Sequence, residues 1–600
     1  MRIPDDPVAL EQCESDPGDP GRADARGMDR RTFMLMSLAA TAAGTVGVDP
    51  ARAQTAGAPA QQQPPQPPVP LGNGEPPALQ FQPYPGGTGA MMEKLARERG
   101  RAAFDRSEFT VEPWRGPAPA SDDEIAFLPA HRLAALIKAR SLSSARLTDI
   151  YLARLKRLNP ILLCAVTIME EQARAEAAKA DAEIKAGRYL GPLHGLPYGL
   201  KDLFSTRGVP TTWGAADFEN RIIDEDAEIV VRLRKAGAVL IAKLATGLFA
   251  QNDQWFRGRT NNPWNPAQGS SGSSAGPASA TIAGCVAFSI GTETQGSIVS
   301  PSIRCGASAL RPTFGRVSRY GGMVLAWSMD RVGPICRTIE DCAMVFHAIH
   351  GVDEKDPSTV TAPFRFERNI ALASLRIGVD SNAPKEFVAK LTELGAKLRE
   401  VGPRPTVAGM GGGALGVEGA AAFDAYVQRK AKETGLDLAN LPEPAGRGGG
   451  ERGGAAGGGA RGGPGGPPAN PMAPADWNPR FVNGRRARAF EYVQGQRRRY
   501  MLITKWADYM KDLDLFIGGP QADVGANAQT GHPCVVVPYK FDVPQQQGGG
   551  RGGATQPPLE PKPQPICAVI VGNLFADDII LSLAHQLQAH TDVHLKHPEL

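Results

Sequence analysis

Residues 269–301 read GSSGSSAGPASATIAGCVAFSIGTETQGSIVSP, a stretch rich in serine and glycine with almost no charge. A flexible linker would explain the small residues, but linkers are rarely followed by an apolar run such as residues 286–291, VAFSIG. The pattern is more typical of a serine nucleophile, which needs an activating base and backbone N–H groups aimed at the developing oxyanion. Ser297 is the candidate, because Gly296 before it lets the backbone approach a substrate closely.

The base for this serine is predicted to be a lysine. No histidine is placed for a Ser-His-Asp triad, and no G-x-S-x-G turn occurs in the sequence. Lys201 ends the nearly uncharged run GPLHGLPYGLK (residues 191–201), where a charged amine is costly unless it has partners. Burial lowers the pKa of a lysine, so that its neutral amine can accept a proton.

These segments resemble the amidase signature family, whose members use a Ser-cisSer-Lys triad. The family's lysine motif is matched by residues 191–202, its G-S-S-G-G segment by residues 272–276, and its G-T-(D/E)-x-x-G-S-I segment by residues 291–298. The blocks around 307–343, 529–541 and 566–578 are similar as well. The resemblance covers roughly residues 121–375 and 485–595, in the family's order.

The resemblance implies a role for each matched residue. Lys201 would take a proton from Ser273, which sits on a cis peptide bond in the family, and Ser273 would take one from Ser297. Ser273 is preferred over its neighbours because it lies 24 residues before Ser297, the family's spacing. Ser297 would attack an amide carbonyl and form an acyl-enzyme, with Ser274 as a supporting hydrogen-bond partner near the lysine. The implied oxyanion hole is made of the N–H groups of Thr294, Gln295, Gly296 and Ser297.

The chain departs from the family at several positions. Gln295 stands where many members have glycine, and its side chain is expected to narrow the site. Val299 replaces an arginine that often pairs with the acid at position 293, so Glu293 needs another partner, for which Arg304 is the candidate. Asp202 is expected to be an acid at a helix N-terminus rather than a catalyst.

The order of segments predicts an α/β fold. Short apolar runs alternate with helical patterns after residue 191, which favours a layered domain with a mixed sheet. The resemblance makes this the amidase-signature fold, a mixed β-sheet core flanked by helices on both faces. We expect a Pro/Gln-rich tether and N-terminal extension over 54–120, with no periodic pattern before Ser121, and one amidase domain over 121–600. Two inserts, a Gly-rich one at about 443–470 and a Gln/Gly/Pro-rich one at about 545–565, are expected to be disordered.

The first 53 residues are interpreted as a twin-arginine signal region. Arg30 and Arg31 precede a short apolar stretch, and Ala51-Arg52-Ala53 has the small-x-small form of a cleavage site. The 27 residues before Met28 are acidic and rich in Pro and Gly, so Met28 is an alternative start. A periplasmic or otherwise extracytoplasmic location follows, with membrane contact only during export.

Composition excludes several classes of partner. The net charge of +4 gives no reason to expect nucleic acid. The eight cysteines form no C-x-x-C pair and no histidine cluster lies beside them, so no zinc site is expected. The resemblance implies no other metal and no cofactor. Cys285, Cys305 and Cys567 lie in apolar or small-residue runs and are interpreted as buried thiols.

The sequence thus predicts an exported amidase that hydrolyses a carboxamide or a peptide-type amide. Two alternatives stay open. One is the A subunit of a glutamyl-tRNA(Gln) amidotransferase, also a member of the family. The other is a catalytically inactive binding protein on the same fold. Residues 376–485, where members of the family differ with their substrates, match no pattern, so the sequence predicts the reaction and not the substrate.

Overall fold

The computed structural model describes residues 81, 83–410, 413–435, 437–440, 484–519, 524–544 and 562–600, all within the compact unit Pro70–Leu600. The signal region, the Pro/Gln-rich part of the tether and the Gly-rich insert lie outside the described residues. Residues 545–561 of the second insert also lie outside the described residues. Strand β15 begins at Gln564, inside the range of about 545–565 that the sequence predicts to be disordered.

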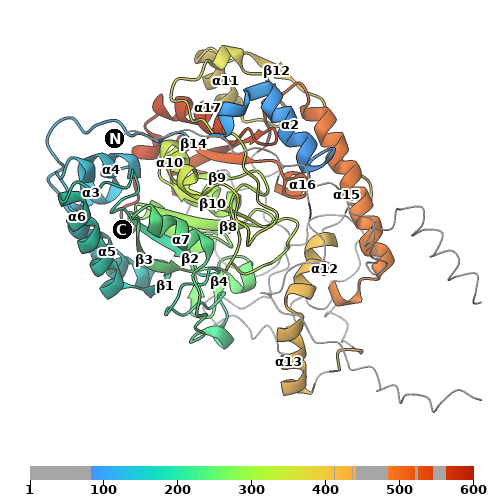
Figure 1. Ribbon diagram of the computed structural model, residues 1–600, viewed down its shortest axis with the longest axis horizontal. Coiled ribbons are helices and arrows are strands. Elements are labelled where there is room, and N and C mark those ends of the chain that lie inside the picture. Colours follow the sequence, from blue (N-terminus) through green and yellow to red (C-terminus); the bar gives the residue numbers. More distant parts are fainter. Residues whose placement is uncertain are drawn as a thin grey trace, which may run out of the picture. The chain divides into compact units, whose positions relative to one another are not determined.

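The core is a mixed sheet of eleven described strands (Figure 1). β2 pairs in parallel with both β3 and β8, and β11 pairs in parallel with β12 and β13, while the remaining pairs are antiparallel. The strands lie in the order β1 (Ala165–Ile168), β3 (Val239–Leu244), β2 (Pro197–Lys201), β8 (Phe288–Glu293), β10 (Arg331–Cys336), β9 (Ser308–Arg311), β14 (Cys534–Asp542), β15 (Gln564–Gly572), β13 (Leu515–Ile517), β11 (Ile377–Val379) and β12 (Leu398–Glu400).

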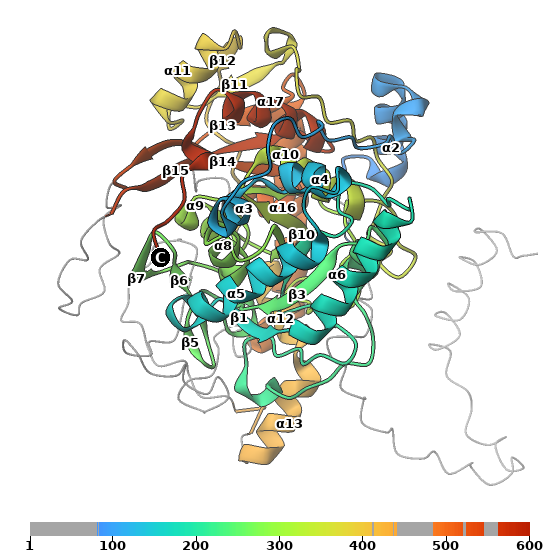
Figure 2. The ribbon, with the colours of Figure 1, turned by 90° about the vertical axis from the view of Figure 1, so that its left-hand side faces the viewer.

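Both faces of this sheet are apolar and covered by helices. Along β14, Val535 and Val537 join one hydrophobic cluster while Cys534 and Val536 join another, as the two-residue period of a strand requires. Helices on the first face include α5 and α6, which lie in front of β1 and β3 in Figure 2. The expected fold class, a mixed sheet between two layers of helices, is confirmed.

The helices of the first cluster are α3 (Asp122–Phe127), α4 (Ala130–Lys138), α5 (Ser144–Leu162), α6 (Glu170–Lys185), α7 (Glu228–Lys235), α10 (Ile339–Ile349), α11 (Lys385–Glu393) and α17 (Asp577–Ala589). Those of the second are α8 (Ala275–Ile282), α9 (Val299–Cys305) and α15 (Ala489–Met510). Further helices are α2 (Gly87–Arg99), α12 (Gly413–Ala422), α13 (Asp424–Thr434) and α16 (Val524–Thr530). Two small antiparallel pairs are β4 (Gln254–Trp255) with β5 (Gly258–Arg259), and β6 (Asn261–Asn262) with β7 (Asn265–Gly269). Short 3-10 helices span Arg101–Phe104, Ala216–Phe218, Leu248–Ala250, Leu372–Ser374 and Val593–Leu595.

The N-terminal extension corrects one expectation, namely that periodic structure starts at Ser121. Helix α2 precedes that residue and buries Met91 and Leu95 in a cluster with Phe575. Two apolar residues one turn apart, in surroundings rich in Pro and Gly, are too weak a pattern to recognise. At Ser121 itself a further helix begins, since its side chain and that of Glu124 form a capping box for α3.

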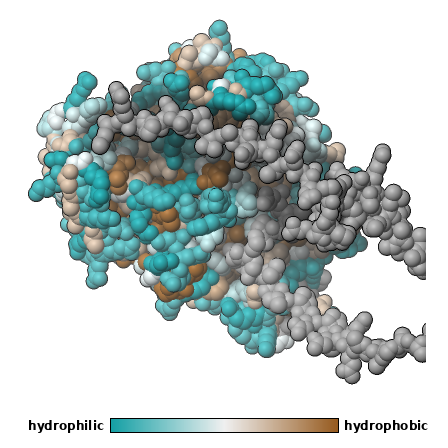
Figure 3. Space-filling model, viewed as in Figure 1, coloured by the Kyte–Doolittle hydropathy of each residue, from teal (hydrophilic) through white to brown (hydrophobic). Residues whose placement is uncertain are grey.

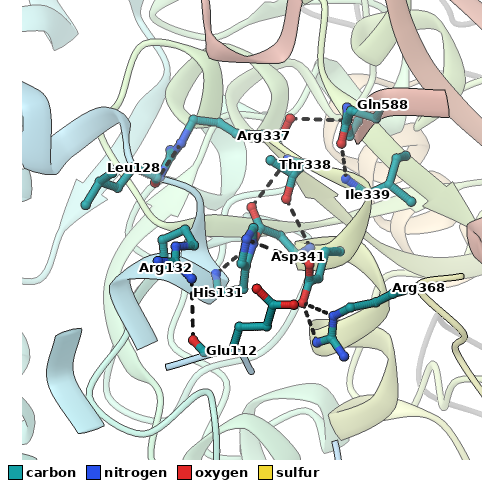
Figure 4. Close-up of polar contacts among 12 residues, drawn as sticks. Glu112, Leu128, His131, Arg132, Arg337, Thr338, Ile339, Asp341, Arg368 and Gln588 are labelled. Carbon is teal, nitrogen blue, oxygen red and sulfur yellow. Dashed lines mark hydrogen bonds and ion pairs between the residues drawn. The ribbon is translucent and has the colours of Figure 1, made fainter. Parts of the chain in front are cut away.

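Polar side chains fasten α4 to α10 at the end of the sheet where β10 finishes (Figure 4). His131 of α4 binds Asp341 of α10 twice, through its backbone N and its Nδ1, each 2.8 Å from Oδ1. Arg337 donates to the Leu128 carbonyl, and Gln588 of α17 accepts from the N–H of Ile339 at 2.8 Å. These bonds satisfy buried polar groups where three helices meet the strand.

Seven of the eight cysteines are described, and all seven are buried free thiols. Cys285, Cys305 and Cys567 are among them, as predicted. Hydrophobic side chains appear on the face shown in Figure 3 as separate patches among hydrophilic ones. None of the helices in the described ranges combines the length and apolarity that a membrane crossing needs.

Candidate active site

Lys201 is the last residue of β2 and is fully buried. Its Nζ lies 2.9 Å from Ser273 Oγ, 3.0 Å from Ser274 Oγ and 2.9 Å from Thr292 Oγ1. No carboxylate of the described chain forms an ion pair with it. Burial lowers the pKa of the Lys201 ammonium well below its usual value, against smaller opposing effects of Asp330 and Glu293. Burial therefore shifts this lysine toward the neutral amine.

The serine loop before α8 brings two hydroxyls to that amine. The Gly272–Ser273 peptide bond is cis, and α8 starts two residues later, at Ala275. Ser274 accepts from Lys201, donates to the Thr292 carbonyl at 3.0 Å and accepts from the Thr292 N–H at 3.2 Å. Ser274 thus ties the lysine to strand β8, in keeping with a supporting role.

Ser270 and Ser271 lie in the same loop without reaching the lysine. The Ser270 hydroxyl donates to the Ser271 carbonyl at 2.9 Å, and the Ser271 N–H donates to Asp253 at 3.0 Å. Both serines therefore make contacts within and beside the loop, and neither forms a hydrogen bond with Lys201.

The turn that carries Ser297 connects β8 to α9. β2 and β8 are parallel neighbours, so Lys201 and Glu293 end them at the same edge of the sheet. Residues 294–297 are called the oxyanion loop hereafter, after the role that the resemblance implies for them. Their backbone N–H groups donate no hydrogen bond to any acceptor in the described chain. Ser297 is half-buried, and its carbonyl accepts from the Ser274 N–H at 3.0 Å. The serine loop and the oxyanion loop are therefore in direct contact.

Gly296 has a backbone conformation that favours glycine. Its φ is +95°, and a Cβ there would lie 2.8 Å from Cγ1 of Val524 on α16. The Gln295 side chain also lies against α16, since its Nε2 is 3.7 Å from the position a Cβ would take on Gly525. Helix α16 therefore forms one wall beside the oxyanion loop.

Glu293 holds the far end of this loop. Its Oε2 accepts from the N–H groups of Ile298 and Val299 at 2.8 and 2.9 Å, and its Oε1 pairs with Arg311 at 2.8 Å. The expected partner Arg304 is wrong, because Arg304 is exposed while Arg311 of β9 reaches the buried carboxylate. Burial raises the pKa of Glu293, but Arg311 and the two N–H groups together bring it below its usual value.

Asp202 also differs from expectation. It lies in a turn after β2, not at a helix N-terminus, and pairs with the buried Lys243 at 2.9 Å. Its other oxygen accepts from the N–H and hydroxyl of Thr212 at 2.9 and 2.5 Å. Asp202 thus links β2 to β3 and is not placed to act on Lys201.

Sequence reasoning missed Thr292 and Asp330. Thr292 lies inside the matched motif, and its hydroxyl is as near to Lys201 as that of Ser273. Asp330 accepts from the Thr294 hydroxyl at 2.5 Å, and its position just before β10 in the matched block was the available signal.

The remaining candidate bases are packed elsewhere. His194 binds Glu183 at 3.1 Å, and His532 is buried with a pKa lowered by burial to about 3. In the described ranges no three His, Cys, Asp or Glu side chains are grouped so as to hold a metal ion.

Comparisons with known proteins identify the family of the chain. The sequence model of the family described as Amidase matches residues 146–408. The A subunit of the glutamyl-tRNA(Gln) amidotransferase from Methylococcus capsulatus is 31% identical over 78% of this chain and 97% of its own length. The chain belongs to the amidase signature family. A putative amidase, AmiD, from Mycobacterium bovis is 40% identical over 48% of this chain and 62% of its own length.

Solved amidases share the fold. An amidase family protein from Bacillus anthracis has a TM-score of 0.64 at 22% identity, covering 80% of this chain and 94% of its own. The native peptide amidase from Stenotrophomonas maltophilia has a TM-score of 0.60 at 24% identity, covering 78% and 98%. At these identities the likeness concerns the fold.

Proposed function

We propose that this amidase-signature enzyme is an exported amide hydrolase that works through an acyl-enzyme on Ser297. The observation that carries the proposal is the Lys201 amine, buried among hydroxyls, 2.9 Å from Ser273 Oγ and without a carboxylate partner in the described chain. A lysine in such surroundings is a base rather than a structural cation.

The proton path balances without any cofactor. Lys201 takes the hydroxyl proton of Ser273, and Ser273 takes that of Ser297 as the Ser297 oxygen bonds to the amide carbon. The proton returns from Lys201 through Ser273 to the leaving nitrogen as the C–N bond breaks. Water then attacks the acyl-enzyme by the same route and releases the acid.

The oxyanion loop supports the same chemistry. Donors fixed before the reaction stabilise developing negative charge without reorganisation, and residues 294–297 supply backbone N–H groups that have no acceptor in the described chain. Glu293 keeps this loop in shape by binding the next two N–H groups.

The substrate class is a carboxamide or peptide-type amide outside the cytoplasm. Export rests on Arg30, Arg31 and the following apolar run, and a twin-arginine route would deliver a folded enzyme whose buried thiols stay free. A protein in that compartment does not meet tRNA. This argument sets hydrolysis above amide transfer, although the Methylococcus relative is named for the latter.

The binding-protein alternative is disfavoured by the intact site. A lysine buried among three hydroxyls lowers the stability of the fold. A protein that only binds gains nothing from this cost, whereas an enzyme gains a base.

The test is labelling of the full-length protein with a fluorophosphonate, followed by peptide mass spectrometry. We expect one adduct, on Ser297, that is absent in Ser297→Ala and strongly slowed in Ser273→Ala. An unlabelled but folded wild type would overturn the hydrolase and favour a binding protein. A panel of primary carboxamides and C-terminally amidated peptides would then define the substrate.

Location is tested by fractionation of cells that produce the full chain. We expect the protein outside the cytoplasm, and retention inside after Arg30→Lys with Arg31→Lys. A wild-type protein confined to the cytoplasm would instead support the amidotransferase alternative.

A further inference from the structure

The oxyanion loop is held at its start by one side chain. Among residues 294–297, Thr294 is the one whose side chain forms a hydrogen bond with another part of the described chain, and its hydroxyl donates to Asp330 Oδ1 at 2.5 Å. The other end is held by Glu293, through the N–H groups of Ile298 and Val299. The carboxylates of Asp330 and Glu293 thus hold the two ends of the oxyanion loop. Of the two, Glu293 lies within the matched motif of residues 291–298, and Asp330 does not.

Asp330 also forms hydrogen bonds with the backbone of the segment in which it lies. Its Oδ2 accepts from the N–H groups of Leu325 and Ala326 at 2.7 and 3.0 Å, and its own N–H donates to the Ala326 carbonyl at 2.9 Å. Residues 325–330, the bracket segment, therefore form a closed turn whose carboxylate points to Thr294.

The bracket segment is fixed from its other side by two buried charged residues. Glu418 of α12 accepts from the Ser328 N–H at 2.9 Å and from its hydroxyl at 2.6 Å. Arg499 of α15 donates to the Ser328 hydroxyl at 2.6 Å and to its carbonyl at 2.8 Å. Both helices belong to the part of the chain that follows the signature motifs, so Ser328 joins that part to the site.

We propose that Asp330 is a positioning residue of the oxyanion loop, which it orients by accepting the Thr294 hydroxyl while the bracket segment is braced by Glu418 and Arg499. The inference rests on the proposed function of Ser297 and adds to it a residue that does not touch the reacting atoms. Thr294, not glycine or an apolar residue, is required at the first loop position because its hydroxyl makes the link.

Asp330 has a second, electrostatic effect by which its role can be separated from mere packing. Its negative charge raises the pKa of Lys201, in opposition to the larger lowering by burial. Asp330→Asn removes the charge but keeps the shape, so the pKa of Lys201 falls further. Thr294→Val removes the hydroxyl and leaves that charge in place.

The experiment measures the second-order rate of fluorophosphonate labelling of Ser297 in the full-length protein as a function of pH. We expect Thr294→Val to slow labelling by about 10-fold to 100-fold with an unchanged midpoint of the pH profile. Asp330→Asn is expected to move the midpoint to lower pH and to slow labelling less, since the asparagine oxygen can still accept the Thr294 hydroxyl. Asp330→Ala removes that acceptor and should slow labelling as Thr294→Val does. The Thr294→Val, Asp330→Ala double variant should be no slower than Asp330→Ala alone, since both changes remove the same bond.

The matched control is Thr338→Val, which removes a hydroxyl that accepts a hydrogen bond from the Asp341 N–H at 3.2 Å. Thr338 follows β10 while Asp330 precedes it, so the control lies at the other end of that strand, about 20 Å away at the rise of a strand. It should label at the wild-type rate. Should Asp330→Asn fail to fold, Thr294→Val still decides.

Three outcomes are distinguishable. Wild-type labelling of Thr294→Val overturns the positioning role while the proposed function stands. A slowed Thr294→Val with an unslowed Thr338→Val supports it. No labelling of the folded wild type overturns the proposed function and, with it, this inference.

Discussion

Lys201 Nζ lies 2.9 Å from Ser273 Oγ, while the second buried lysine, Lys243, pairs with Asp202 at 2.9 Å. Both amines are fully buried, and burial lowers the pKa of each. They differ in what surrounds them, since hydroxyls hold the first and a carboxylate holds the second. The first is suited to the proposed role of a base, and the second forms a buried ion pair.

Replacing the two lysines by methionine should therefore have opposite effects. Lys201→Met is expected to slow fluorophosphonate labelling at least about 100-fold, as loss of a general base does. Its melting temperature should stay equal or rise: a lysine whose folded pKa is lowered destabilises the fold below its unfolded pKa of about 10.4, and the variant removes that cost. Lys243→Met leaves Asp202 buried and unpaired, and should lose about 3–5 kcal/mol of stability.

Labelling rates against pH and thermal melting of both variants check this prediction. In the wild type the rate should rise with pH through the lowered pKa of Lys201, at a lower pH than an exposed lysine would give. The prediction would be contradicted if Lys201→Met melted far below the wild type while Lys243→Met melted normally. Lys201 would then be the lysine that the fold requires, and Lys243 would not.

The Glu293–Arg311 pair is expected to be essential for the shape of the oxyanion loop. Both side chains are 1% exposed or less, so Glu293→Gln removes the carboxylate charge that pairs with Arg311 and should cost about 3–5 kcal/mol. Because the pKa of Glu293 is lowered on folding, its contribution is present above the unfolded pKa of about 4.3 and is lost as pH falls through the folded value.

Chemical denaturation of Glu293→Gln, Arg311→Met and the double variant measures this coupling. We expect the double variant to be more stable than the sum of the single losses predicts, by at least about 1 kcal/mol. Additive losses would show that the two charges do not support each other.

The partner of Glu293 could not be predicted from the sequence. The sequence identifies Glu293 as an acid in need of a partner, but it points to an arginine nearby in the chain, Arg304. The true partner lies on β9, which is separated from β8 by β10. Motif spacing does not encode the order of strands in a sheet, and that order decides which side chains meet.

Local patterns are more successful. Short apolar runs after residue 191 predict the strands of a mixed sheet, and those at 515–517 and 566–572 lie in β13 and β15. The matched motifs also lead to Lys201 and Ser273, which the structure places 2.9 Å apart. Thr292 and Asp330 are missed because a polar residue in a motif does not reveal which atom its side chain reaches.

The His131–Asp341 pair should make stability depend on pH. Burial lowers the pKa of His131, but Asp341 and Glu340 raise it by more, so that its folded value is above the unfolded value of about 6.5. The contribution of the pair is then complete below pH 6.5 and is lost as pH rises through the folded pKa. His131→Asn should cost about 1–2 kcal/mol at pH 5.5 and less at pH 9.

Urea unfolding of wild type and variant at several pH values tests this difference. The control is His590→Asn, since His590 is exposed and its ring binds a backbone carbonyl at 2.7 Å. A loss in His131→Asn that is independent of pH would mean that the pair contributes by packing alone.

Gly296→Ala should impair labelling for two separable reasons. The φ of +95° is unfavourable for alanine, and the new Cβ would meet Val524 Cγ1 at 2.8 Å. We expect the labelling rate to fall at least about 10-fold because the N–H groups of the loop shift. Val524→Ala in the same chain removes the clash with Val524 but not the backbone strain, so it should restore only part of the rate.

The control is Gly495→Ala, since Gly495 lies within α15 and no atom lies within 4 Å of the position of a Cβ there. This variant should label normally and gain about 0.5–1 kcal/mol of stability. Full recovery in the Gly296→Ala, Val524→Ala protein would show that the contact with α16, and not the left-handed backbone, is what requires glycine at this position.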